Sequence, residues 1–370
     1  MRRMITSQHK HFLELVRAGF WEKDVELREY GATDFDEIMR LAEEQSVVGL
    51  VTAGLEHVTD VNVPKVELLQ FIGQTLQIEE QNKAMNEFVV QLMDKLRKED
   101  VSPILVKGQG VAQCYEKPLW RASGDVDLLL SEKDYNTAKA VLEPMADDVA
   151  EENRATKHQA YVIKGFDVEL HGRMPFGMSR RADKVIDEVI ESSLCSHVNV
   201  NLNDNGEFWL PRADEHVILV FTHFLHHFFI EGVGLRQICD WCRLLWRYRA
   251  ELDLRLLEQR IRRMGLMTEW RVFATLAVQY LGMPREAMPL IDENDNEKYK
   301  KKAEKVLERV MKSGNFGHNN DLSYRSRYTG VTYKAVAMWR RFTDFASLVP
   351  VFPLDAPRFY VTYLFGKVRQ

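Results

Sequence analysis

Apolar residues recur at spacings of three and four over most of the first 97 residues, with few glycines or prolines between them. The same spacing returns at Pro211 and continues to about Leu281. Residues three and four apart share one face of a helix, so both stretches are predicted to be helical. The residues that carry the two patterns are Phe12, Leu15, Val16, Ile38, Leu41, Ala42, Leu68, Leu69, Ile72, Leu76, Val217, Ile218, Phe221, Phe224, Leu225, Leu235, Ile238, Leu244 and Leu245.

The stretch between these two regions has the pattern of short strands. One strand is expected over 101–106, ending at the glycine turn 107–110, and a second over 126–130. Ser131 and Asp134 then suit the start of a helix that runs to about Met145. Residues 159–163 and 166–171 flank a Lys164-Gly165 turn, and the second run alternates in period two, which predicts a hairpin.

These elements predict an α+β protein in three parts. We expect an N-terminal helical region over 1–97, a mixed-sheet α+β domain over 98–205, and a helical C-terminal region over 206–370.

The amino-acid composition limits the class of protein but does not indicate a function. The chain has 370 residues, of which 45% are hydrophobic and 28% charged, so a folded protein of two or three domains is expected. The net charge of −5 argues against binding of long nucleic acid. Four widely spaced cysteines indicate free thiols, and no apolar run is long enough to span a membrane. A cytoplasmic location is therefore expected.

Asp125 and Asp127 are the most informative pair in the sequence. Alternate residues of a strand share a face, so both carboxylates point the same way from Cα atoms about 6–7 Å apart. Such a pair can bind two hard cations and direct a displacement at phosphorus. The ordinary alternative is a solvated acidic pair that protects a sheet edge.

The surroundings of this pair favour the chemical interpretation. The turn before it carries Lys107 and Gly108, where backbone N–H groups can approach a phosphate closely and an ammonium adds positive charge. After it, the predicted strand 166–171 places Asp167, Glu169 and His171 on one face. A third carboxylate is therefore available beside the first two.

These motifs together resemble the DNA polymerase beta-like nucleotidyltransferase superfamily, which combines a glycine turn, an Asp-x-Asp strand and a later acidic strand. "LVKGQGVAQCY", "RASGDVDLLL" and "DVELHGRM" more narrowly resemble a bacterial group of largely uncharacterised nucleotidyltransferases. The resemblance covers 103–174 and extends more loosely to His223 and to "LRQICD" at 235–240. It implies that the central domain is a minimal nucleotidyltransferase sheet.

The resemblance also implies roles for individual residues. Asp125, Asp127 and Glu169 would be the catalytic residues and would hold Mg²⁺ or Mn²⁺. The nucleotide would be bound by Lys107, Gly108, Gln109, Arg121 and Gly124. His171, His223, Arg236 and Asp240 would help to hold the substrates.

One departure from the superfamily pattern concerns the turn. Gln109 stands where the superfamily usually has serine or a second glycine, so a serine contact to phosphate is missing. A backbone contact or Lys107 could replace that contact, and the alternatives are weaker triphosphate binding or a non-catalytic descendant.

Several other features have competing interpretations. His171 is expected either to contact the metal site and acceptor or to pack at the end of the sheet. Two pairs of residues have spacings that suit zinc ligands, namely His223 with His227 and Cys239 with Cys242. Both pairs lie in apolar helical stretches, where core packing is favoured. For Arg236 and Asp240 the alternative is a simple ion pair one helical turn apart. The aromatic and basic segment from Met338 onward would bind a membrane or partner, or, as we favour, pack across the helical region.

We therefore expect a metal-dependent enzyme that moves a nucleoside monophosphate from a nucleoside triphosphate to an acceptor hydroxyl or phosphate and releases pyrophosphate. The acceptor is expected to be a small molecule, a sugar or a protein. Two rivals are a non-catalytic nucleotide-binding or scaffold protein with the same fold, and a glycosidase that uses Asp127 and Glu169.

Overall fold

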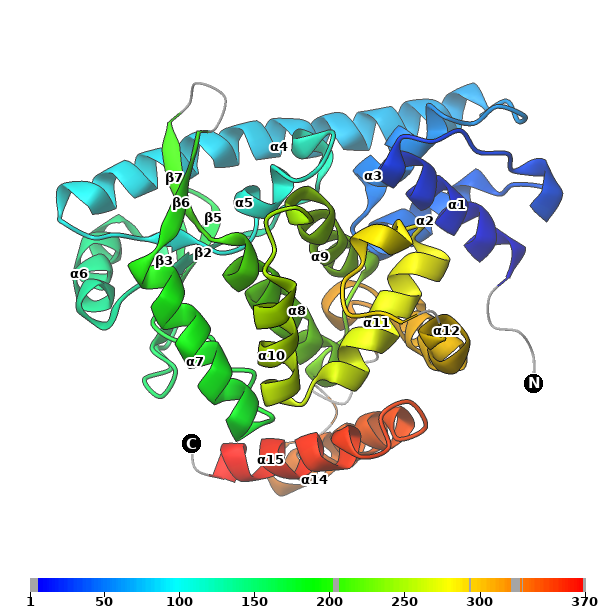
Figure 1. Cartoon of the computed structure of the whole chain (residues 1–370). Coiled ribbons are helices and arrows are strands. Elements are labelled where there is room, and N and C mark those ends of the chain that lie inside the picture. The colour runs from blue at the N-terminus through cyan, green and yellow to red at the C-terminus, as the bar shows by residue number, and fades with distance from the viewer. Residues whose placement is uncertain (1–5, 202–205, 293, 321–326, 328, 369–370) are drawn as a thin grey trace.

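The computed structural model describes residues 6–201, 206–292, 294–320, 327 and 329–368. The predicted helical N-terminal region is confirmed. Its helices are α1 (Ser7–Trp21), α2 (Phe35–Glu44), α3 (Val48–Leu55) and α4 (Lys65–Lys98). The 34 residues of α4 give it a length of about 50 Å, and it runs along the top of the molecule from the N-terminal helices to the sheet (Figure 1).

The strands within the described residues form one mixed seven-stranded sheet with the order β3-β4-β5-β2-β1-β7-β6. Strands β2 and β5 are parallel neighbours, as are β1 and β7, and the other neighbouring strands are antiparallel. The strand bounds are β1 Ile104–Leu105, β2 Asp125–Leu129, β3 Asp148–Val149, β4 His158–Ile163, β5 Phe166–His171, β6 His197–Asn201 and β7 Glu207–Pro211.

The expected α+β class is confirmed, and so are the strand 126–130 and the hairpin, with shifts of a residue at their ends. The first strand is shorter than predicted, because pairing is confined to Ile104 and Leu105. Ser131 caps helix α6 (Glu132–Leu142) by accepting a hydrogen bond from the Asp134 N–H. Strands β6 and β7 were not foreseen, and β7 extends the sheet beyond the boundary expected at residue 205.

Helices build the remainder of the chain. Short α5 (Gln109–Ala112) follows the glycine turn, and 3-10 turns occupy 28–30, 118–120, 143–145, 285–287 and 315–317. The longer helices are α7 Arg180–Cys195, α8 Ala213–Ile230, α9 Leu235–Tyr248, α10 Leu254–Met264, α11 Met267–Tyr280, α12 Asp295–Ser313, α14 Gly330–Leu348 and α15 Asp355–Val368.

The two faces of the sheet pack into different cores. Alternate residues such as Val126, Leu128, Val168 and Leu170 pack with the second half of α4 and with α6. On the opposite side, Leu129 joins a larger apolar core that includes α8 and α9. Side chains between the buried positions of β2 and β5 therefore project toward the helices of the C-terminal half.

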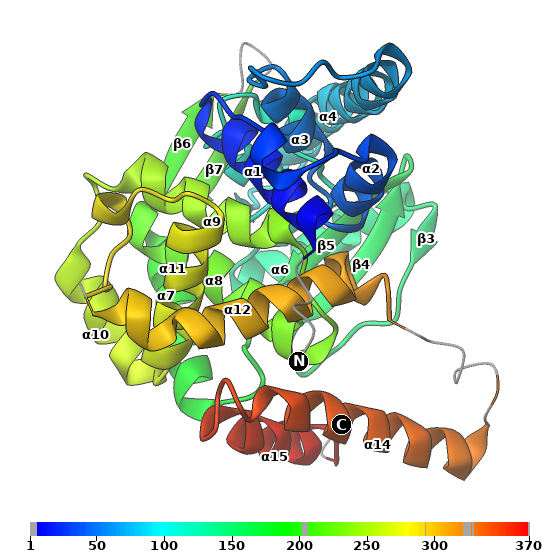
Figure 2. The ribbon, with the colours of Figure 1, turned by 90° about the vertical axis from the view of Figure 1, so that its right-hand side faces the viewer.

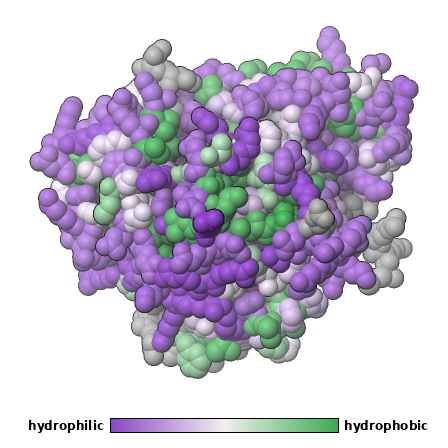
Figure 3. All heavy atoms as spheres, in the orientation of Figure 1, coloured by the Kyte–Doolittle hydropathy of each residue, from purple (hydrophilic) through white to green (hydrophobic). Residues whose placement is uncertain are grey.

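The C-terminal helices pack on this larger core, as favoured from the sequence. Rings of Phe345, Phe352 and Phe359 contact Phe229, and Figure 2 shows α14 and α15 side by side along one flank. In Figure 3, hydrophilic residues cover most of one face, while apolar residues gather near its centre and lower edge. All four cysteines are free thiols. No helix in the described part of the chain is long and apolar enough to cross a membrane.

Candidate active site

Three carboxylates meet on neighbouring strands at the face that points toward α8. Asp127 of β2 is the register partner of Glu169 in β5, and Asp125 is the partner of Asp167. Asp125, Asp127 and Glu169 each offer an oxygen within 4.8 Å of the others, whereas Asp167 is exposed and stands outside this group. The alternation of the two strands thus produces the predicted acidic cluster.

Burial makes the charges of this cluster strongly interdependent. The charge of Asp127, and then burial, raise the pKa of Asp125. Burial alone would raise the pKa of Asp127, but Lys107 and His171 outweigh it and lower that pKa. Burial likewise opposes ionisation of Glu169, yet hydrogen bonds from His158 and His171 bring its pKa well below the usual range.

This donor set suits a hard divalent cation. Asp127 is fully buried, its Oδ1 lies 2.6 Å from Lys107 Nζ, and its Oδ2 has no hydrogen-bond partner among the described residues. A buried carboxylate oxygen without a partner is costly. Three carboxylates also supply the oxygen ligands that Mg²⁺ and Mn²⁺ prefer, so the residues fit the metal that the sequence led us to expect.

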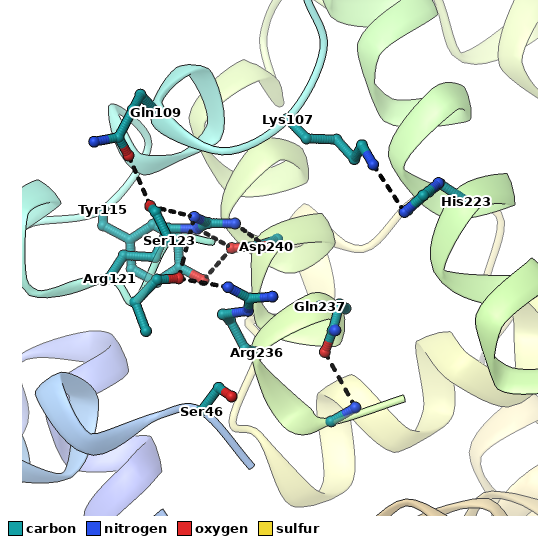
Figure 4. A network of polar contacts seen from close by, with 12 residues as sticks. Ser46, Lys107, Gln109, Tyr115, Arg121, Ser123, His223, Arg236, Gln237 and Asp240 are labelled. Carbon is teal, nitrogen blue, oxygen red and sulfur yellow. Dashed lines mark hydrogen bonds and ion pairs between the residues drawn. The ribbon is translucent and has the colours of Figure 1, made fainter. Parts of the chain in front are cut away.

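Lys107 joins the acidic cluster to helix α8. Its Nζ lies 3.0 Å from Nε2 of His223, which is drawn in Figure 4. Burial and then the Lys107 charge lower the pKa of His223 well below its ordinary value, so a neutral imidazole accepts the hydrogen bond. Lys107 therefore bridges Asp127 and His223 while keeping 14% of its side chain exposed.

The glycine turn is fixed from both sides. Gly108 has a φ of +56°, and a Cβ at this position would lie 3.0 Å from the carbonyl oxygen of Asp125. The buried Gln109 side chain donates to Asn86 Oδ1 at 2.7 Å and accepts from the Ser123 hydroxyl at 2.7 Å. Gln109 therefore anchors the turn to α4. Gly124 faces open space, because a methyl group on its Cα would meet no heavy atom within 4 Å.

Arg121 is held by Asp240 in a buried, two-pronged ion pair. Its Nε and Nη2 donate to the two Asp240 oxygens at 2.7 and 2.6 Å, and the Tyr115 hydroxyl donates to the same carboxylate at 2.8 Å (Figure 4). Burial opposes its charge, but Asp240 raises the pKa of Arg121. Asp240 therefore pairs with Arg121, which is distant in the sequence, and not with Arg236 on the same helix.

Arg236 approaches the same place from α9. Its Nη1 donates to the Ala122 carbonyl at 2.6 Å, while its Nε is buried without a partner among the described residues. Burial, followed by the nearby Arg121 charge, lowers the pKa of Arg236. A small cavity of about 30 Å³ is lined by Lys107, Gly108, Arg121, Asp125, Arg236 and Asp240, among others.

A larger cavity of about 440 Å³ opens on the other side of the carboxylates. Glu169, His171 and His223 form part of its wall, and apolar residues such as Met174 and Phe176 form much of the rest. His171 is buried, and its Nε2 lies 2.9 Å from Asp127 Oδ1 and 3.3 Å from Glu169 Oε2. Of the two interpretations of His171, contact with the acidic cluster is the one observed.

The histidine and cysteine pairs considered as zinc ligands do not converge. Cys239 and Cys242 are fully buried, whereas His223 Nε2 contacts Lys107 Nζ and His227 Nδ1 lies 3.2 Å from Glu231 Oε2. Within the described residues, the groups that could hold a metal are the three carboxylates and the set His158, Glu169 and His171. The cysteines therefore pack as core residues.

Sequence reasoning missed His158, which lies directly opposite His171 across the hairpin. The two-residue turn at Lys164 and Gly165 would have revealed it, because that turn pairs 163 with 166 and hence 158 with 171. Tyr115, Asn86 and Ser123 were also missed, and their roles depend on contacts between distant segments.

This geometry, with three carboxylates on neighbouring strands behind a glycine turn, is the arrangement that the sequence resemblance implied. Residues 31–282 match the family described as uncharacterised nucleotidyltransferase. The chain belongs to this nucleotidyltransferase family. No curated protein and no solved structure matches the sequence significantly.

Proposed function

We propose that this protein transfers a nucleoside monophosphate from a nucleoside triphosphate to a hydroxyl group of a small-molecule acceptor. The acceptor oxygen bonds to the α-phosphorus, the bond from that phosphorus to the β-phosphate oxygen breaks, and pyrophosphate leaves. The observation that carries the proposal is the convergence of Asp125, Asp127 and Glu169, with a buried oxygen of Asp127 that lacks a partner among the described residues.

Asp125, Asp127 and Glu169 would hold Mg²⁺ or Mn²⁺. A bound divalent ion neutralises phosphate charge and favours the deprotonated form of the acceptor hydroxyl. The backbone of β2 and β5 fixes the three carboxylates, because both strands lie inside the sheet with their alternate residues buried. The site is thus organised before substrate arrives, which reduces the cost of reaching the reactive geometry.

The triphosphate is assigned to the side of Asp125. Lys107 and Arg236 line the small cavity there and supply positive charge, and Gly108 allows close approach of the turn backbone. The cavity of about 30 Å³ must widen when a triphosphate binds. Arg121 lines the same cavity, but both of its outer donors are directed at Asp240 and Ser123. Arg121 therefore orients the loop that carries Asp125, and its charge acts on phosphate over a longer distance.

The acceptor is assigned to the side of Glu169. The cavity there has a volume of about 440 Å³, within the range of about 300–1,000 Å³ for small-molecule sites. Burial keeps His223 and His226 in the neutral form by lowering their pKa values. The cationic groups in the wall are already paired, Arg173 with Asp187 and His171 with Asp127 and Glu169. The apolar surface and the two neutral imidazoles therefore suit an uncharged molecule with a hydroxyl better than a phosphorylated chain.

The test uses the full chain with Mg²⁺ and each of the four common nucleoside triphosphates labelled at the α-phosphate. Binding is followed by equilibrium dialysis, and transfer by the appearance of label in acceptors from a fractionated metabolite extract together with pyrophosphate. We expect Mg²⁺-dependent binding of at least one triphosphate, and its loss in Asp127→Asn. Equal binding by wild type and D127N would contradict the proposal.

A second candidate is a non-catalytic nucleotide-binding protein. The observation in its favour is that the buried Gln109 side chain bonds to Asn86 and Ser123 and so has no free group for phosphate. Triphosphate binding without any pyrophosphate release, in the presence of every acceptor fraction, would favour this candidate. The glycosidase alternative is disfavoured by the positions of Asp127 and Glu169, whose oxygens lie within 4.8 Å on neighbouring strands beside Lys107.

A further inference from the structure

Two imidazoles and a carboxylate converge at the floor of the 440 Å³ cavity. His158 Nε2 lies 3.1 Å from Glu169 Oε2, and His171 Nε2 lies 3.3 Å from the same oxygen. The two rings are 4.8 Å apart between centroids and inclined by 32°. All three side chains come from the β4–β5 hairpin, in which His158 is the register partner of His171.

These separations match the edges of a metal coordination shell. Ligand bonds of about 2.0–2.1 Å at tetrahedral angles place neighbouring donor atoms about 3.3–3.4 Å apart. The two distances to Glu169 Oε2 are 3.1 and 3.3 Å, and Asp127 Oδ1, which pairs with Lys107 at 2.6 Å, lies 2.9 Å from His171 Nε2. The two nitrogens and the Glu169 oxygen therefore form a set of three ligand atoms that lie within 4.8 Å of one another.

In the metal-free protein, His158 Nε2 hydrogen bonds to Glu169 and His171 Nε2 hydrogen bonds to Asp127, so both nitrogens are already held beside carboxylate oxygens. The Nε2 atoms of both histidines also lie within 3.3 Å of the same Glu169 oxygen. A cation between these atoms would accept the lone pair of each nitrogen and satisfy both carboxylates together.

We propose that His158, His171 and Glu169 form a second metal position, selective for a divalent first-row transition metal ion that accepts imidazole nitrogen. Mg²⁺ binds oxygen ligands and retains water, whereas imidazole suits ions such as Zn²⁺ and Co²⁺. This position differs in selectivity from the cluster of Asp125, Asp127 and Glu169. Glu169 is common to both, and one carboxylate can bridge two ions.

The surroundings leave such an ion accessible and incompletely coordinated. His158 keeps 34% of its side chain exposed and Glu169 keeps 30%, and both line the cavity. Catalytic metal sites characteristically combine three protein ligands with an open position for substrate or water. The open positions here face the cavity assigned to the acceptor. The metal position itself does not depend on nucleotidyl transfer.

The test measures binding of Co²⁺ and Zn²⁺ to the metal-free full chain. Wild type should bind Co²⁺ with a visible absorption band that Zn²⁺ abolishes and that a roughly 100-fold excess of Mg²⁺ leaves in place. His158→Gln should weaken Co²⁺ binding by at least about 10-fold. Asp125→Asn should retain it, because Asp125 belongs only to the carboxylate cluster.

His57→Gln is the matched control. His57 Nε2 lies 2.9 Å from Glu22 Oε2, and Asp24 is nearby, but this surface group is far along the chain from the hairpin. H57Q should bind Co²⁺ as wild type does. Equal affinity in H158Q and wild type, or displacement of Co²⁺ by the excess of Mg²⁺, would overturn the proposal.

If H158Q does not fold, a measurement on the wild-type protein tests the proposed metal position instead. X-ray absorption of the Zn²⁺-loaded wild type should show scattering from two imidazole rings. A shell of oxygen ligands alone would overturn the proposal. Because these readouts do not involve transfer, a protein that binds Co²⁺ at His158 but transfers nothing would refute only the proposed function.

Discussion

Lys107 Nζ lies 2.6 Å from Asp127 Oδ1 inside the fold, where Asp127 is fully buried. Burial alone would lower the pKa of Lys107, but the charges of Asp127 and Asp125 raise it. The ammonium therefore supplies positive charge to a cluster of three carboxylates. It stabilises that cluster, and it stands beside the place proposed for the metal.

Lys107→Met should destabilise the metal-free protein. Removal of the ammonium leaves Asp127 buried beside Asp125 and Glu169, and loss of one partner of a buried ion pair costs about 3–5 kcal/mol. Added Mg²⁺ should then raise the melting temperature of K107M by more than that of wild type. Thermal unfolding of both proteins, with and without Mg²⁺, measures the effect.

Lys117→Met is the control for that substitution. Lys117 pairs with Glu56, and both side chains are substantially exposed, so the expected loss is at most about 1 kcal/mol. If K107M were no less stable than K117M without metal, the stabilising role assigned to Lys107 would be wrong.

Asp240→Asn should destabilise the protein by about 3–5 kcal/mol, because it leaves the buried Arg121 guanidinium without its counter-charge. The double variant Arg121→Met, Asp240→Leu removes both charges and should recover most of that loss. Urea unfolding measures the free energies. Glu188→Gln breaks an exposed pair in which Arg263 also donates to both oxygens, and should change the stability far less than D240N does. Equal losses in D240N and E188Q would show that burial of the Arg121 pair has no energetic consequence.

The buried His216 predicts acid destabilisation. Burial lowers the pKa of His216 to about 4, and its Nε2–H donates to the Val106 carbonyl at 2.9 Å. The unfolded chain takes up a proton below about pH 6.5 and the folded chain does not until about pH 4. This residue's contribution to stability is therefore complete above about pH 6.5 and falls by about 3 kcal/mol as the pH drops to about 4.

His216→Gln keeps an N–H donor and removes the titration. Between about pH 6.5 and 4, H216Q should take up as much as one proton fewer on unfolding than wild type does. Its free energy of unfolding should consequently depend less steeply on pH. Denaturant unfolding at several pH values gives both slopes. Parallel slopes would mean that His216 is not held neutral by burial.

Thr156→Trp should block the larger cavity. Thr156 lies at the wall of that cavity, so an indole there would exclude an acceptor without touching Lys107 or Asp125 on the opposite side. Nucleotidyl transfer should fall at least about 10-fold while binding of the Mg²⁺–triphosphate stays unchanged. Thr137→Trp, at an exposed position of α6, should alter neither quantity. Unchanged transfer in T156W would show that the acceptor does not bind in this cavity.

The sequence predicted those parts of the site that depend on local periodicity. Alternation along β2 and β5 identified Asp125, Asp127, Glu169 and His171, because the buried residues between them leave one orientation for each strand. The glycine turn was also recognised, since Gly108 adopts a positive φ that favours glycine.

Contacts between distant segments could not be deduced in the same way. The ion pair of Arg121 with Asp240 joins a loop to a helix 119 residues away, and Lys107 meets His223 across 116 residues. Local patterns do not specify which buried charges will pair. Strands β6 and β7 pair with each other as a local hairpin, whereas the pairing of β7 with β1, which joins this hairpin to the sheet, is a contact between distant segments.

Metal-dependent nucleotidyl transfer is proposed to depend on the three carboxylates of β2 and β5. The most direct measurement incubates the full chain with Mg²⁺, α-labelled nucleoside triphosphates and fractionated metabolites, and follows label transfer together with pyrophosphate. We expect transfer by wild type, and a loss of at least about 100-fold in Asp125→Asn, Asp127→Asn and Glu169→Gln that retain the wild-type fold. Transfer that persists in all three folded variants would contradict this proposal.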